Sequence, residues 1–125
     1  MYVIDNATAP RAALPGIENE TLAGSSNGLR RLSVWRATIA AGAATPPHRH
    51  DCEEVVIVQS GRGELHIAGA AHTFGPDTTL AIPANVDHQI VNTGAEPIRL
   101  VAALSASPVA VFLPDGTALP LPWPT

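Results

Sequence analysis

Two histidines and a glutamate in the segment 42–61, GAATPPHRHDCEEVVIVQSG, constrain this chain more than any other feature. His48 and His50 are separated by one residue, so in an extended segment both side chains point to the same face. Glu54 follows four residues after His50, and the apolar run 55–58 predicts a strand that leads away from it. Two imidazoles and a carboxylate make part of a metal site, although this segment alone is equally well explained as the polar end of a strand.

The composition predicts one all-β domain that spans residues 1–125. The chain has 46% hydrophobic and 14% charged residues, with 12 prolines and 10 glycines. This balance is typical of short strands joined by tight turns, and the length suffices for one hydrophobic core. We therefore expect a single domain with an extension at 1–30, the histidine-rich centre at 42–92 and a proline-rich tail at 114–125.

Charge and cysteine content exclude several classes of partner. The net charge is −4, and Arg30 and Arg31 are the only adjacent pair of basic residues, which indicates neither nucleic-acid binding nor an anionic membrane surface.

The first residues lack the basic start and apolar run of a signal peptide, and no segment is apolar for long enough to span a membrane. Cys52 is the only cysteine, so no internal disulfide can form. We expect a cytoplasmic protein.

Turn residues and alternating apolar positions predict the remaining strands. Residues 1–30 should be mostly loop, with one or two short strands that include an edge strand at 2–4. No helix of three turns is predicted. The other strands are expected at 29–40, 55–58, 64–68, 72–74, 79–82, 86–92, 98–104 and 108–113.

The other three histidines differ in the face that they should occupy. His66 alternates with apolar neighbours on both sides, so it should face water when they face the core. His72 is expected on the surface of a short strand. His88 shares a face with Ile90 and Asn92, which places it inside the fold.

The segment 42–92 resembles the cupin family, whose two motifs are G-x5-HxH-x3,4-E-x6-G and G-x5-PxG-x2-H-x3-N. The first motif fits in every position, and the second departs only at its two glycines, which Asp77 and Asn85 replace. Asp and Asn tolerate a positive φ better than other non-glycine residues, so both turns should be preserved. The matching residues are Gly42, His48, His50, Glu54, Gly61, Pro83, His88 and Asn92.

The resemblance implies a jelly-roll barrel of two antiparallel sheets that holds one divalent metal. The ligands carried over from the motifs are His48, His50, Glu54 and His88. Such a donor set suits Fe, Mn, Ni, Cu or Zn, and affinity alone does not choose among them. Glu53 could take the place of Glu54, whereas Cys52 is expected to pack near the site without binding.

An open metal site in a barrel favours a metal-dependent enzyme that acts on a small oxygen-bearing metabolite, with dioxygenase-like chemistry first. A metal-dependent isomerase or lyase and a non-catalytic, ligand-binding or regulatory cupin remain alternatives, because the fold does not fix the function. Glu53 or Cys52 could move a proton at the rim. The pocket should be lined by apolar side chains such as Val56, Val58, Phe74, Ile90 and Leu104.

The apolar ends of the chain predict a homodimer. Residues 2–4 and the tail up to Trp123 carry apolar side chains that a small barrel does not cover fully. We expect these segments to lie across the partner and to protect its sheet edges.

Overall fold

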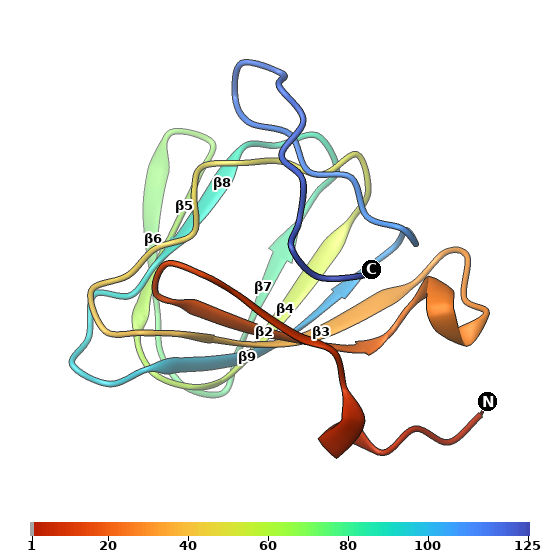
Figure 1. The fold of residues 1–125 in the computed structure, drawn as a ribbon. Helices are drawn as coiled ribbons and strands as arrows, with labels where there is room; N and C mark the ends of the chain where they lie inside the picture. Colours follow the sequence, from red (N-terminus) through yellow and green to blue (C-terminus); the bar gives the residue numbers. More distant parts are fainter. Residues whose placement is uncertain (1) are drawn as a thin grey trace.

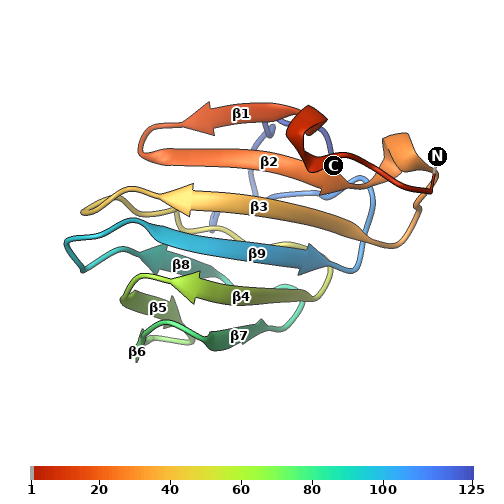
Figure 2. The same ribbon diagram turned by 90° about the horizontal axis from the view of Figure 1, so that it is seen from below.

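Nine strands form two antiparallel sheets in the computed structural model, which describes residues 2–125. The larger sheet has the order β1-β2-β3-β9-β4-β7 and the smaller sheet has the order β6-β5-β8. Figure 1 and Figure 2 show the smaller sheet facing the larger one. The strands are β1 (Arg11–Leu14), β2 (Ile17–Ala23), β3 (Ser33–Ile39), β4 (Glu54–Ser60), β5 (Gly63–Ile67), β6 (Ala70–Phe74), β7 (Thr78–Ile82), β8 (His88–Val91) and β9 (Ile98–Leu104).

The predicted all-β class is confirmed, and the alternation in the sequence explains which side chains form the core. In β4, Val56 and Val58 are buried, while Val55 and Ile57 between them point outward and are 40% and 48% exposed. In β9, every second residue from Ile98 to Leu104 is buried. Each buried valine, isoleucine or leucine side chain stabilises the fold by about 1.5–3 kcal/mol through the apolar area that it removes from water.

The two residues that replace glycine in the second cupin motif adopt the conformation that a glycine would adopt there. Asp77 has a φ of 57° and Asn85 a φ of 63°. The glycine at the end of the first motif is required for a second reason, because a Cβ on Gly61 would lie 2.7 Å from the backbone of Ile98. The prediction that both substituted turns are preserved is confirmed.

The N-terminal third is more regular than expected. β1 and β2 form a hairpin, and β2 pairs along its length with β3, so this segment extends the larger sheet. The predicted edge strand at 2–4 is wrong: these residues have no strand pairing, and Tyr2 and Val3 are exposed. The sequence did not indicate this hairpin, because the outward-facing acidic residues of β2 alternate with its inward-facing residues and make the segment polar on average.

The C-terminal region folds back on its own barrel. The strand expected at 108–113 is wrong, because Phe112 forms only isolated bridges, to Arg49 and Ala118. Beyond it the tail runs to the end of β2 (Figure 1), where Thr21 Oγ1 donates to the carbonyl of Pro124 at 2.6 Å. Trp123 is buried in its own chain, so the prediction that it lies across a partner is wrong.

Helical structure is limited to two single turns of 3₁₀ helix in residues 2–125, η1 (Asn6–Thr8) and η2 (Ser25–Asn27). Within this described part, no helix has the length and apolar character needed to cross a membrane.

Candidate metal centre

His48 and His88 face each other across an antiparallel bridge at one end of the barrel. The amide of His48 donates to the carbonyl of His88 at 3.0 Å, and the reverse bond is 2.8 Å long. His50 follows two residues later on the same segment. The ring centroid of His48 lies 5.0 Å from that of His50 and 4.4 Å from that of His88. Backbone pairing thus joins residues that are distant in sequence into one cluster.

Each of the three imidazole rings is oriented by a backbone carbonyl. Nδ1 of His48 lies 2.6 Å from the carbonyl oxygen of Pro46. Nδ1 of His50 lies 2.9 Å from that of Ala110, and Nδ1 of His88 lies 2.9 Å from that of Val86. A carbonyl oxygen only accepts, so each hydrogen bond requires the proton on Nδ1. The lone pair of each neutral ring then lies on Nε2, as in metal sites whose histidines donate their other nitrogen to a carbonyl.

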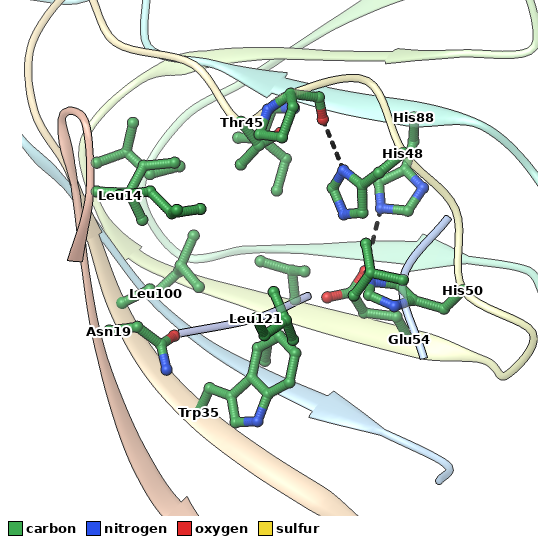
Figure 3. A pocket seen from close by; sticks show the side chains of 18 of the residues that line it. Leu14, Asn19, Trp35, Thr45, His48, His50, Glu54, His88, Leu100 and Leu121 are labelled. Carbon is green, nitrogen blue, oxygen red and sulfur yellow. Dashed lines mark hydrogen bonds and ion pairs between the residues drawn. The ribbon is translucent and has the colours of Figure 1, made fainter. Parts of the chain in front are cut away.

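The three histidines form a cluster that could hold a metal ion, with one ligand atom from each ring within 4.8 Å of the others. Glu54, the first residue of β4, places Oε1 3.2 Å from Nε2 of His88 and 3.7 Å from Nε2 of His50. Figure 3 shows the carboxylate between these rings and the pocket. The structure therefore brings together all four residues that the motifs predicted as ligands.

Two atoms of this cluster lack hydrogen bonds within residues 2–125. His50 Nε2 and Glu54 Oε1 are buried and have no partner with hydrogen-bond geometry. Burying such atoms without a partner is costly, and a cation bound between a nitrogen lone pair and a carboxylate oxygen removes that cost. The donor set, its orientation and these unpaired atoms fit a divalent transition metal.

The surroundings shift the pKa values of three groups in the metal-free cluster. Enclosure by the protein and the neighbouring His88 lower the pKa of His48 to about 4. Burial also acts to lower the pKa of His88, but its contact with the Glu54 carboxylate outweighs this and raises it. The pKa of Glu54 is lowered, because the rings of His88 and His50 outweigh the effect of burial. At neutral pH His48 is therefore already in the form that binds metal.

The other residues considered from the sequence lie away from this cluster. Glu53 is exposed, and its backbone amide is bonded to Ser105 Oγ, so Glu54 is the glutamate that faces the histidines. Burial raises the pKa of the Cys52 thiol, which packs in the core. His66 is partly exposed and bonded to Glu64, and His72 is exposed.

An apolar pocket adjoins the histidines (Figure 3). Of the expected lining residues, Val56 and Ile90 contribute, while Val58, Phe74 and Leu104 do not line it. Val58 and Leu104 are buried on the same strands as pocket residues, but they pack in the core instead. Both kinds of position show the same alternation in the sequence, which therefore does not distinguish them. The sequence pattern did not indicate the other lining residues, which are Leu14, Ile17, Asn19, Trp35, Ala37, Ile39, Thr45, Pro46, Leu100, Ala102, Val111, Leu119, Leu121 and Trp123.

The C-terminal tail supplies one wall of this pocket. Leu119, Leu121 and Trp123 alternate with prolines, so a strand-like extended chain directs all three to one face. Trp123 packs edge-on against Trp35, with ring centroids 5.6 Å apart, and Trp35 lies 6.4 Å from the ring of His50. The Leu-Pro-Leu-Pro-Trp alternation was the signal that could have predicted this wall.

The family model described as "Auxin binding protein" matches residues 4–122 of this chain. The chain belongs to the auxin-binding protein family. It is 37% identical over 117 residues to auxin-binding protein T92 of Nicotiana tabacum, and the matched region covers 84% of this chain and 63% of the tobacco protein. It is 34% identical over 116 residues to auxin-binding protein 1 of Arabidopsis thaliana, which covers 85% of this chain and 59% of that protein. The chain thus spans less than two thirds of these plant relatives.

The barrel is also similar to solved cupin structures. An RmlC-like cupin from Shewanella frigidimarina superposes with a TM-score of 0.75 at 16% sequence identity, over 86% of this chain and 93% of that one. At this identity the likeness shows the fold alone. The cupin jelly roll and the family resemblance predicted from the motifs are confirmed.

Proposed function

We propose that this auxin-binding family member captures a small organic acid, with the acid group on a metal ion and an apolar body in the adjoining pocket. His48, His50, Glu54 and His88 would hold the metal. The single observation that carries this proposal is the composition of the pocket wall: within the described residues, its only ionisable side chains are these four.

Charge determines which end of the ligand meets the metal. Three neutral imidazoles and one carboxylate leave a divalent ion with a net positive charge, so the ion supplies an anchor for an anionic oxygen. The rest of the wall is almost entirely aliphatic and indole carbon, which suits an apolar ligand body. The names of the plant relatives, which describe binding and no reaction, support the same function.

Dioxygenase-like turnover is the second candidate function. It is favoured by the nitrogen and oxygen donor set, which suits Fe(II). Isomerase or lyase chemistry is less well supported, because proton transfer needs a group within hydrogen-bond reach of the ligand. Glu53 and Cys52, considered for that role from the sequence, are not among the residues that line the pocket.

The metal part of the proposal is tested first. Elemental analysis should find one transition metal per chain, and the double variant His48→Ala/His88→Ala should lose it at neutral pH. The matched control is His66→Ala/His72→Ala, which removes two histidines outside the cluster and should keep the metal. Full occupancy in the first variant would contradict the proposed ligands.

The ligand part is tested by calorimetric titration of the metal-loaded protein with phenylacetate, phenylpropanoate and phenylbutanoate. Binding that disappears with the metal supports an acid anchored at the centre. An oxygen electrode run on the same mixtures separates the two candidate functions, because capture consumes no oxygen. Steady oxygen consumption with the iron-loaded protein would favour turnover instead.

A further inference from the structure

Buried polar atoms without partners are concentrated in one place in this fold. Within residues 2–125, six buried side-chain nitrogen or oxygen atoms have no hydrogen-bond partner, and five of them belong to residues that line the pocket. His50 and Glu54 are explained by the metal centre. The other three are the indole Nε1 atoms of Trp35 and Trp123, which pack edge-on against each other, and the amide Nδ2 of Asn19 on β2.

Asn19 occupies a position where an apolar residue is the usual choice. It is the third residue of β2, only 2% exposed, and its inward-facing neighbours on the strand are Ile17 and Thr21. Its Nδ2 has no partner in the described part of the chain. An amide that is buried without a partner weakens a fold, so its presence in a pocket wall indicates a role outside folding.

The sheet register places Asn19 far from the metal centre. Asn19 pairs with Ala37, Ala37 with Leu100, and Leu100 with Val58. Glu54 lies four residues before Val58 on β4. The two side chains are therefore separated by about 14 Å across the strands and about 13 Å along them when measured on the sheet surface.

Figure 3 shows Asn19 on the side of the pocket opposite His50 and Glu54. Its cross-strand neighbour Ala37 has the smallest side chain in that row of the wall. The pocket thus has polar groups at two ends and an apolar region between them.

We propose that Asn19 is a second recognition point, which donates a hydrogen bond from Nδ2 to an acceptor at the end of the ligand remote from its acid group. This inference rests on the proposed function. It narrows the ligand class to elongated acids with a carbonyl or similar acceptor beyond an apolar middle. A simple apolar acid leaves the amide unpaired, and the site discriminates against it.

The test compares three matched pairs of ligands on the metal-loaded protein: phenylacetate, phenylpropanoate and phenylbutanoate, each with its para-acetyl counterpart. At the length that fits, we expect the acetyl compound to bind about fivefold more tightly than its unsubstituted partner, as one added neutral hydrogen bond predicts. Asn19→Leu should abolish this preference while it keeps affinity for the unsubstituted acid. Ile17→Val is the control, because it changes the apolar wall nearby and should affect both members of a pair equally.

Thermal unfolding of Asn19→Leu provides a readout that separates recognition from a structural role. If the amide has no partner in the protein, the leucine variant should be at least as stable as the wild type. A lower melting temperature would show a structural role and overturn the inference. A wild type that binds the acids without preferring any acetyl compound would also overturn it and leave the proposed function intact, whereas failure of all six acids to bind would overturn both.

Discussion

Asn92 should be among the side chains on which the stability of this fold depends most. It is 2% exposed and its amide makes three hydrogen bonds. Nδ2 donates to the carbonyls of Ile39 at 3.0 Å and Glu96 at 2.9 Å, and Oδ1 accepts from the amide of Gly94 at 2.9 Å. The side chain therefore fastens the loop after β8 to the end of β3.

Asn92→Ala removes all three bonds and leaves three backbone groups without their partner. At about 1 kcal/mol for each bond, the free energy of unfolding should fall by about 3 kcal/mol. With a urea dependence of about 2 kcal/mol/M, the midpoint should decrease by about 1.5 M. The measurement is urea unfolding of protein treated with a chelator, so that metal binding does not add to the stability.

Asn27→Ala is the matched control for this prediction. Asn27 is half-buried, and its side chain accepts one hydrogen bond, from the amide of Gly24 at 3.1 Å. Its loss should cost about 1 kcal/mol or less. If the two variants lose the same stability, the reasoning from the three bonds of Asn92 is refuted.

Three further predictions concern the site and the assembly. In metal-free protein the pKa of His48 is lowered from 6.5 to about 4. Between these two pH values, the imidazole is protonated in the unfolded chain but not in the folded chain. Stability should therefore fall by about 2 kcal/mol as the pH drops through this window, allowing for the partial exposure of the ring; urea unfolding of His48→Asn should lack this component. Trp123→Ala should cost about 3 kcal/mol and weaken acid binding, because it removes part of the wall and the contact with Trp35; unchanged affinity in titration would contradict this. We still expect a homodimer, because the apolar side chains of Tyr2 and Val3 remain exposed; light scattering that gives a mass near 12.9 kDa would argue against it.

The local pattern of the sequence determined the strands and the identity of the clustered residues. Alternation with a period of two residues is a property of each strand by itself, so β4, β5, β7 and β9 were predicted within two residues at either end. The grouping of His48, His50 and Glu54 with the distant His88 was implied by the resemblance to the two cupin motifs. The left-handed turns at Asp77 and Asn85 followed from the conformational tolerance of those two residue types.

Only the tertiary structure decided which inward-facing residues line the pocket and which fill the core. Val58 and Asn19 both point inward, yet Val58 packs in the core and Asn19 faces the pocket, because the register across β3 and β9 sets their positions. The tail is a second example. Its alternation of apolar residues and prolines is visible in the sequence, but its contact with Trp35 depends on where the barrel opens. Local periodicity fixes the face that a side chain occupies, whereas its neighbours depend on strand pairing between distant segments, which no local pattern encodes.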